Sequence, residues 1–246
     1  MVSLLAFSQV EIIAHRGASW LAPENTVASA RLAWEKGADA VECDIWLSKD
    51  NRIICSHDGN TKRTTGQDFK ISDTDSKVLG KLDAGSFKDE KFKGEKLPFL
   101  EEIIKTVPSG KELVVEIKCG SEILPFLQKV IKKYERTRQF VFICFDFQTI
   151  TSTKKTFPDK KCYWLCSNRE LLEKTFDNIP GSGLNGVSLG YAIISEDVIR
   201  KAENMNLEVY SWTVDDPEEA KRLVSLGVKG ITTNRPGWLE EQAGIK

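Results

Sequence analysis

Two histidines and a pair of closely spaced carboxylates are the residues of this chain best suited to chemistry. His15 and His57 are the only histidines among the 246 residues, and each follows an apolar, strand-like run. An unperturbed imidazole titrates near neutral pH, so two of them at one place suit a base and an acid in proton transfer. Glu42 and Asp44 lie between them in the sequence. We expect these three places to converge on one site.

Carboxylates on two strand-like runs point to a cation. Glu42 and Asp44 are two residues apart, as are Glu116 and Lys118. Side chains at positions i and i+2 of a strand share a face, so each pair points to one side. If both faces look into one opening, three carboxylates repel each other unless they take up protons or a cation. Oxygen ligands favour Mg²⁺ or Ca²⁺, and no His/Cys quartet is spaced for zinc.

Two basic residues accompany these groups. Arg16 and Lys118 beside a divalent cation would make a strongly positive pocket, which suits a phosphate. Each feature alone also has a structural interpretation: a solvated Glu-x-Asp face, a histidine packed at a strand end, a lysine exposed to solvent. Trp212 fits either the core or a pocket wall. The prediction of a site therefore depends on the combination of these residues.

The order of apolar patterns predicts an α/β fold. Eight strand-like runs alternate with helical patterns, and they are centred on Val10, Val41, Val114, Val141, Tyr163, Val187, Val209 and Ile231. Residues 52–56 form a further run that pairs with the second strand across a turn at Asp50-Asn51. Eight such units predict a (β/α)8 TIM barrel. A doubly wound open sheet is the rival, but it usually carries a Gly-rich GxGxxG loop after its first strand, which is absent here.

Helices are expected between these strands. Their patterns cover residues 23–36, 97–104, 123–134, 147–156, 169–176, 195–205 and 217–226, with a last helix from residue 236. The length suits one barrel domain over residues 1–246. Apolar residues thin out over 66–96, where Lys, Asp and Gly accumulate. This stretch is predicted to be an irregular insertion between the second and third barrel strands, too small for its own core.

The amino-acid composition argues against some classes of function. The chain has 35 basic and 36 acidic side chains, a net charge of -1, so no global field favours nucleic acid or an anionic membrane. No apolar run reaches the roughly 18 residues of a membrane span, so we expect no stable membrane insertion. Residues 1–7 are apolar but lack a basic start, so we expect no signal peptide. Six cysteines without a CxxC pair favour a reducing compartment, and hence a cytoplasmic location.

A set of short motifs, in order, resembles the glycerophosphodiester phosphodiesterase family. The motifs span nearly the whole chain; they are His15-Arg16-Gly17, Pro23-Glu24-Asn25-Thr26, Glu42-Cys43-Asp44, His57-Asp58 with Arg63-Thr64-Thr65-Gly66, Leu97-Pro98-Phe99-Leu100-Glu101-Glu102, Glu116-Ile117-Lys118, Trp212-Thr213-Val214 and Asn234-Arg235-Pro236. Each motif is weak alone, but eight in this order are specific. Two small departures, Cys43 and Phe99, replace no group with a chemical role.

The resemblance implies a compact barrel enzyme that hydrolyses glycerophosphodiesters to glycerol 3-phosphate and an alcohol with one divalent cation, Mg²⁺ or Ca²⁺. It implies roles for individual residues: His15 and His57 as the acid/base pair, Glu42, Asp44 and Glu116 as metal ligands, and Arg16, Asn25, Lys118 and Trp212 around the phosphate or glycerol. Two alternatives remain: a lysophospholipase D-like hydrolase acting on lysolipids, and a non-catalytic barrel that binds phosphorylated ligands. The preferred alcohol and the oligomeric state are not predicted.

Overall fold

The computed structural model describes residues 10–137 and 139–245. The expectation about the apolar segment 1–7 lies outside these residues. Within the described part of the chain, no helix combines the length and apolar character that crossing a bilayer requires.

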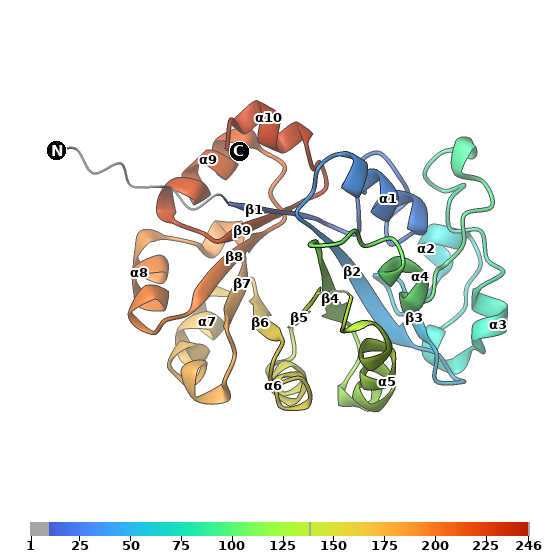
Figure 1. The fold of residues 1–246 in the computed structure, drawn as a ribbon, viewed down its shortest axis with the longest axis horizontal. Coiled ribbons are helices and arrows are strands. Elements are labelled where there is room, and N and C mark those ends of the chain that lie inside the picture. Colours follow the sequence, from blue (N-terminus) through green and yellow to red (C-terminus); the bar gives the residue numbers. More distant parts are fainter. Residues whose placement is uncertain (1–9, 138, 246) are drawn as a thin grey trace.

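Eight parallel strands form a closed barrel, as the sequence predicts (Figure 1). They follow the order β1-β2-β4-β5-β6-β7-β8-β9, and β9 pairs again with β1. The ninth strand, β3, runs antiparallel to β2 outside the ring, in the position expected for residues 52–56. The strands are β1 Glu11–Ala14, β2 Ala40–Leu47, β3 Ile53–Cys55, β4 Glu112–Ile117, β5 Gln139–Cys144, β6 Lys161–Cys166, β7 Gly186–Gly190, β8 Glu208–Trp212 and β9 Gly230–Thr233.

Helices surround the strands (Figure 1). They are α1 Val27–Glu35, α2 Lys62–Thr65, α3 Ser76–Leu79, α4 Leu100–Ile104, α5 Leu124–Tyr134, α6 Phe147–Thr156, α7 Arg169–Thr175, α8 Glu196–Asn204, α9 Pro217–Leu226 and α10 Trp238–Ala243. The first helix begins later than the sequence predicts, because Thr26 caps it by accepting a hydrogen bond from the backbone of Ser29. Residues 24–25 form a turn before it, from which Glu24 bonds Arg16 and Asn25 bonds Asp44.

Burial explains the nearly continuous apolar strands. A large cluster of apolar side chains fills the layer between the strands and the helices, and a smaller cluster fills the inside of the barrel. Parallel strands covered on both faces are expected to be apolar on both faces. The inner cluster comprises Ile13, Ala40, Val114, Val141, Ile143, Tyr163, Leu165 and Tyr210. The barrel is thus a packed core, and polar side chains gather at its two ends.

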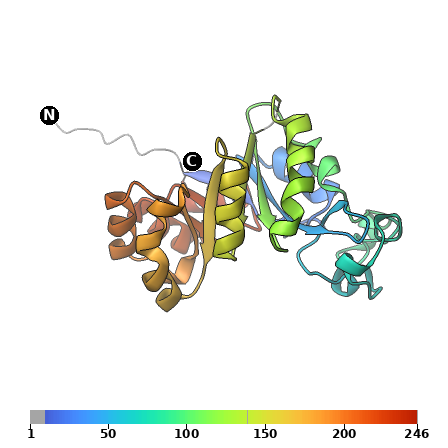
Figure 2. The same ribbon diagram turned by 90° about the horizontal axis from the view of Figure 1, so that it is seen from below.

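The chain between β3 and α4, residues 56–99, is called the excursion from here on. It is more ordered than the sequence predicts for residues 66–96. It contains α2, α3 and two 3₁₀ turns, at Ile71–Asp73 and Glu90–Phe92. In Figures 1 and 2, α2 and α3 lie together at one side of the barrel. The excursion also buries a small apolar cluster, formed by Ile54, Ile71, Leu79, Leu82, Ala84 and Leu97. Residues 66–96 thus contain a short helix and two 3₁₀ turns, but their apolar side chains pack on Ile54 of β3 and do not form a core of their own.

The amino end of the barrel holds a buried carboxyl group. Glu11, at the start of β1, accepts a hydrogen bond from the hydroxyl of Tyr210 at 2.9 Å. It lines a cavity of about 20 Å³ together with Glu112. Burial, followed by the negative charge of Glu112, raises the pKa of Glu11 from 4.5 to about 7. A raised pKa means that this group favours folding at low pH and loses that contribution as the pH rises to 7.

Glu11→Gln is expected to stabilise the protein at alkaline pH. The glutamine amide oxygen can still accept the hydrogen bond from Tyr210, while the buried charge is removed. The free energy of unfolding should rise by about 1–3 kcal/mol at pH 8 and by less than about 1 kcal/mol at pH 5. Urea unfolding at the two pH values measures this difference. An equal change in unfolding free energy at pH 5 and pH 8 would show that Glu11 does not titrate between these two pH values.

Candidate active site

The carboxyl ends of the barrel strands bring the predicted site residues together. His15 and Arg16 follow β1, and Lys118 follows β4. The side chains surround a cavity of about 130 Å³ lined by His15, Arg16, Glu42, His57, Glu116, Lys118, Ile143, Phe145, Leu165, Ser188, Trp212, Thr213 and Thr232. Seven of these are residues that the sequence singles out. Active sites of (β/α)8 barrels lie at this end.

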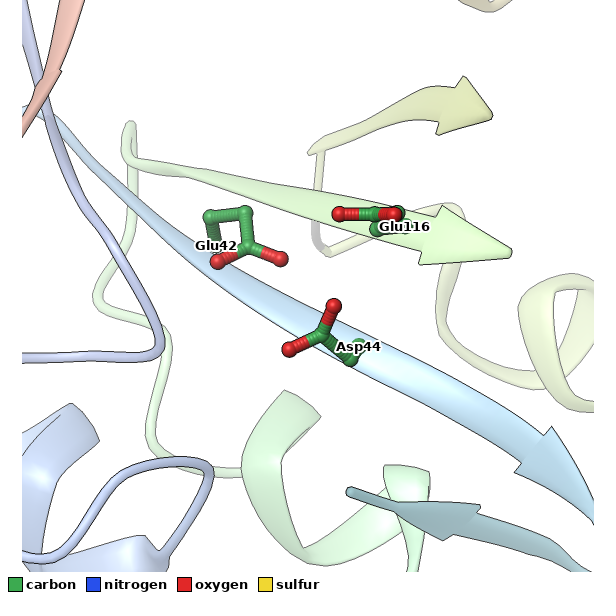
Figure 3. A group of neighbouring side chains, drawn as sticks. All are labelled: Glu42, Asp44 and Glu116. Atoms are coloured by element: carbon green, nitrogen blue, oxygen red, sulfur yellow. The ribbon is translucent and has the colours of Figure 1, made fainter. Parts of the chain in front are cut away.

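Three carboxylates lie close together on β2 and β4 (Figure 3), and two of them, Glu42 and Glu116, line the cavity. Glu42 and Asp44 come from β2, and Glu116 comes from β4 at the position paired with Asp44. One oxygen of each lies within 4.8 Å of the others, and all three residues are buried. Among the described residues, Oε1 of Glu42 and Oδ1 of Asp44 accept no hydrogen bond. Buried oxygens left with free lone pairs fit the ligand set of a hard divalent cation.

Electrostatics supports the same conclusion. Burial and then the charge of Asp44 raise the pKa of Glu42 well above 4.5. The same two causes raise the pKa of Glu116 to about 7, and the lysine beside it opposes this. A bound cation would reverse these shifts by favouring the charged form. The three carboxylates thus make a site that is costly when empty and suited to a divalent ion.

Arg16 is held by an unusual backbone conformation. Its φ angle is 54°, in the left-handed region, and its backbone N–H donates to Oε2 of Glu42 at 2.8 Å. The guanidinium lies 3.0 Å from Oε1 of Glu24 and 3.3 Å from Oδ2 of Asp44. The loop after β1 therefore binds one carboxylate of the cluster through its backbone and another through its side chain. Arg16 is also one of the residues that line the cavity.

Lys118 and Asn25 both contact the cluster. Nζ of Lys118 lies 2.7 Å from Oε1 of Glu116 and 3.5 Å from Oδ1 of Asp44. Asn25 is buried, and its two amide atoms both bond Asp44: Nδ2 donates to Oδ2, and Oδ1 accepts from the backbone N–H. Asn25 is absent from the cavity lining. The role implied for Asn25 at the phosphate or glycerol stays a prediction, and the structure adds that its amide holds Asp44.

His15 is fixed by a chain of side chains. Its Nδ1 lies 2.7 Å from Oδ1 of Asn234, and Nδ2 of that asparagine donates to Asp215 at 2.6 Å. Because the amide nitrogen faces Asp215, the amide oxygen faces the ring, and Nδ1 must carry the proton. The lone pair of His15 is then on Nε2. Burial, and next the charge of Arg16, lower the pKa of His15 to about 4, so the ring is neutral at pH 7.

His57 has a carboxylate partner instead of an amide. Its Nδ1 lies 2.7 Å from Oδ1 of Asp58, and its backbone carbonyl accepts a hydrogen bond from Trp46. Because a carboxylate only accepts hydrogen bonds, this contact places a proton on Nδ1 of His57. The two imidazoles therefore have different surroundings. His15 is partly buried and faces an amide and a cation, whereas His57 faces an anion.

Aromatic residues form the wall between the ends of β5 and β8. Trp212 donates from Nε1 to the carbonyl of Ser188 at 3.0 Å and contacts Phe145 edge to face, with ring centroids 5.4 Å apart. Both line the cavity, and Nζ of Lys118 lies 5.7 Å from the Phe145 ring. The structure thus places Trp212 on the pocket wall, one of its two expected positions. Phe145 was not singled out in the sequence.

Comparison with known proteins identifies the family. The model of the glycerophosphoryl diester phosphodiesterase family matches residues 15–238. The chain belongs to this family. A glycerophosphodiester phosphodiesterase from Caldanaerobacter subterraneus is 32% identical over 230 residues, covering 92% of this chain and 94% of the relative. A phosphodiesterase structure from Oleispira antarctica, in complex with the product sn-glycerol-3-phosphate, has a TM-score of 0.89 at 26% identity, covering 96% of this chain and 97% of that one.

Membership decides between enzyme and binding protein. Glycerophosphodiester phosphodiesterases are metal-dependent hydrolases of glycerophosphodiesters, so this chain is an enzyme and the non-catalytic alternative is not retained. The buried acidic cluster is able to hold the metal ion. A human lysophospholipase D is also similar, at 25% identity over 266 residues, covering 93% of this chain and 84% of the relative.

Sequence reasoning missed the residues that hold the others in this phosphodiesterase. Glu24, Asp58, Arg63 and Asn234 occur in motifs that were recognised, but no role was inferred for them. Three of them, Glu24, Asp58 and Asn234, contact a predicted site residue, and Arg63 bonds Glu24 and Asp58. For Asp58 the signal was available, because a carboxylate directly after a histidine is a natural hydrogen-bond partner. For Asn234 the motif was recognised, but nothing indicated its contact with His15, which is 219 residues away in the sequence.

Gly17→Ala is expected to destabilise the loop that carries Arg16. Gly17 has φ +78°, and an added Cβ would lie 2.5 Å from the backbone of Ser29. The left-handed strain and the clash together should cost about 2–4 kcal/mol of unfolding free energy and reduce activity. Gly37→Ala is the matched control, because Gly37 has φ +85° but free space around its Cβ position. That change should cost about 1–2 kcal/mol. Urea unfolding measures both variants. Equal losses of unfolding free energy in Gly17→Ala and Gly37→Ala would contradict the predicted clash.

Proposed function

We propose that this enzyme hydrolyses glycerophosphodiesters to glycerol 3-phosphate and an alcohol, with His15 and His57 as the acid/base pair. Glu42, Asp44 and Glu116 hold one divalent cation. The observation that carries the proposal is that both imidazoles, two of the carboxylates and two basic side chains line one cavity of about 130 Å³. Binding a phosphate needs only the basic groups. The paired imidazoles add proton transfer, which is what hydrolysis requires.

The cation is proposed to be Mg²⁺ or Ca²⁺, because all three side-chain ligands are carboxylates. When bound, it supplies electrostatic stabilisation to the non-bridging oxygens of a phosphodiester and lowers the charge repulsion within the cluster. Asn25 fixes the orientation of Asp44 through both atoms of its amide. Arg16 and Lys118 complete the positive surroundings, and Trp212 forms the wall against which the substrate packs.

His15 is proposed to act first as the base. Its pKa of about 4 leaves the ring neutral at pH 7, and the bond from Nδ1 to Asn234 leaves the lone pair of Nε2 available. The glycerol hydroxyl next to the phosphodiester gives its proton to Nε2 of His15 as its oxygen attacks phosphorus. An oxygen that attacks from within the same substrate needs no separate binding step, which is an advantage of proximity.

His57 is proposed to act first as the acid. Its Nδ1 is held by Asp58, and Nε2 gives its proton to the oxygen of the departing alcohol as the P–O bond breaks. The product of this step is a cyclic glycerol phosphate. Water then opens the ring with the roles exchanged: His57 accepts a proton from water, and His15 returns one to the glycerol oxygen. Both histidines end in their starting states, so protons balance over the cycle.

A lysophospholipid is the second candidate substrate. Trp20 and Leu21 are exposed on the loop after β1, and Phe87 is exposed on the excursion. Apolar side chains near a site opening suit an acyl chain. Comparing choline release from glycerophosphocholine and from lysophosphatidylcholine separates the two: release only from the soluble diester supports the first substrate, and preferential release from the lysolipid supports the second.

Two further points belong to the proposal. All six cysteines are free, and five are buried, which supports a reducing, cytoplasmic location. The single-domain organisation over residues 1–246 remains a prediction. The family match over residues 15–238 supports it. No oligomeric state is proposed.

A coupled assay tests the proposed activity. Purified protein is incubated with several glycerophosphodiesters, and release of glycerol 3-phosphate is followed with and without a chelator. We expect release that stops on chelation and returns with Mg²⁺ or Ca²⁺. Absence of release with every diester in the presence of both ions would contradict the proposal.

A further inference from the structure

Arg63 lies where the excursion meets the barrel opening. It belongs to the four-residue helix α2, and its side chain is about half exposed. Its guanidinium nevertheless makes three short hydrogen bonds to two carboxylates. Nε donates to Oδ2 of Asp58 at 2.7 Å, while the two terminal nitrogens donate to the two oxygens of Glu24, each at 2.8 Å. This is a planar, two-sided arrangement that only a guanidinium can make.

The first carboxylate, Asp58, connects Arg63 to the imidazole of His57. Asp58 accepts from Arg63 on Oδ2 and contacts Nδ1 of His57 with Oδ1, at 2.7 Å in each case. Asp58 is itself partly exposed, so the protein interior alone does not fix its orientation. Burial opposes ionisation of Asp58, but the hydrogen bonds from Arg63 and His57 lower its pKa below the usual 3.8. Arg63 therefore keeps this carboxylate charged and turned toward the ring.

The second carboxylate, Glu24, connects Arg63 to Arg16, the arginine proposed to bind the phosphate. Oε1 of Glu24 accepts from Arg63 at 2.8 Å and from Arg16 at 3.0 Å. Burial opposes ionisation of Glu24, but the hydrogen bonds from Arg63 and the charge of Arg16 lower its pKa to about 2. The carboxylate is thus ionised and shared between two arginines. Removing one arginine would leave Glu24 free to pair fully with the other.

Arg63, Asp58 and Glu24 are absent from the lining of the cavity, so the two chains of contacts reach the site only through His57 and Arg16. We propose that Arg63 is a positioning residue, which sets the imidazole of His57 through Asp58 and the guanidinium of Arg16 through Glu24. The inference rests on the proposed function of those two residues. It assigns to the excursion a part in catalysis: one side chain from it orients both a proton-transfer group and a phosphate-binding group.

Variants of Arg63 test the proposal in the full chain. Arg63→Ala should lower kcat/KM for glycerophosphocholine by about 10- to 100-fold, a typical loss for a residue that orients a group in the site. Both kcat and KM should change. Arg63→Lys should recover only part of the loss, because an ammonium cannot bond both carboxylates in the same plane. Added guanidinium ion should restore part of the activity of Arg63→Ala.

Arg52→Ala is the matched control. Arg52 is also about half exposed and pairs with a glutamate, Glu101, at 3.3 Å, but it does not contact the site residues described above. Exposed pairs contribute about 0–1 kcal/mol to stability, so both alanine variants should keep the wild-type fold by circular dichroism and thermal unfolding. A change in activity confined to Arg63 then reports on the site and not on surface charge.

The two chains of contacts are separated by a cycle of variants. Asp58→Asn should mainly lower kcat, and Glu24→Gln should mainly raise KM and weaken inhibition by glycerol 3-phosphate. Adding Arg63→Ala to Asp58→Asn should then affect KM but hardly kcat. Adding it to Glu24→Gln should affect kcat but hardly KM. Non-additivity of this kind is expected when residues act through one another.

Three outcomes would overturn the inference in a wild-type enzyme that is active. Arg63→Ala could behave like Arg52→Ala, its effects could add fully to those of both other variants, or guanidinium ion could fail to restore any activity. A wild-type protein without phosphodiesterase activity would instead refute the proposed function. The two failures are therefore distinguishable in one set of assays.

Discussion

His15→Ala is expected to lower kcat by about 10²- to 10⁴-fold, the usual contribution of a positioned proton-transfer group. The reason is the ring's fixed protonation state. Asn234 holds the proton on Nδ1, and a pKa of about 4 keeps Nε2 free to accept a proton at pH 7. Thermal unfolding should change little, because Asn234 keeps its hydrogen bonds to Asp215 in the variant. Steady-state kinetics on glycerophosphocholine measures the loss.

His57→Ala should cause a loss of the same order. The double variant should be only slightly slower than either single variant, because a base without its acid retains little advantage. Added imidazole should restore part of the activity of each single variant. Turnover near that of the wild type in either variant would remove that histidine from the mechanism. Circular dichroism shows whether a variant that has lost activity has also lost its fold.

Glu42→Gln is expected to lower activity by more than about 100-fold and to stabilise the metal-free protein. The activity falls because one carboxylate ligand is lost from the cluster. The stability rises because a buried charge is replaced by an amide, which can still accept from the backbone of Arg16 and can donate to a neighbouring carboxylate. Cation-dependent stabilisation should also disappear. Thermal unfolding with chelator and with Mg²⁺ or Ca²⁺ measures both effects.

The pH dependence of this variant follows from the direction of the pKa shift. Because the folded-state pKa of Glu42 is raised, its ionisation destabilises the metal-free fold as the pH rises above about 4.5. The advantage of glutamine should therefore be small near pH 4.5 and grow at higher pH. Glu173→Gln is the control, since Glu173 is exposed on α7 and pairs only with Arg169 among the described residues. A Glu42→Gln variant that keeps its activity, or that is less stable without metal at pH 8, would contradict a metal site here.

Much of the site could be predicted because its residues lie on or next to strands. The two-residue spacing of Glu42 and Asp44 places both on one face of β2, whatever the rest of the chain does. Eight parallel strands then bring their carboxyl ends to one opening, so the positions of Glu116 and His15 follow from the fold. His57 is placed differently, by the antiparallel pairing of β3 with β2. Strand position and barrel closure together decide this part of the site. Both leave a clear periodic signal in the sequence.

The residues that orient the site could not be predicted in the same way. Asn234 meets His15 only because β9 closes the barrel against β1, and no local pattern records that contact. Arg63 lies in a four-residue helix, too short to show a period. The resemblance implied a contact of Asn25 with the substrate, but not its bond to Asp44, toward which a left-handed backbone with φ 57° turns the side chain. Side-chain direction in loops depends on such backbone angles.

Helix boundaries show the same limit. A helix was expected from Leu97, yet α4 begins at Leu100. Residues before it are extended, because the carbonyl of Pro98 accepts a hydrogen bond from the backbone of Cys55 and Phe99 pairs with Ile54. A contact with β3 thus delays the helix by three residues. Tertiary pairing of this kind leaves no mark on local propensity.

A crystal structure with Mg²⁺ or Ca²⁺ and glycerol 3-phosphate tests the central claim most directly. The account predicts one cation bound by oxygens of Glu42, Asp44 and Glu116, with the phosphate beside it and Nε2 of both His15 and His57 within hydrogen-bond reach of phosphate oxygens. A cation bound elsewhere, or an imidazole turned away from the phosphate, would contradict the account.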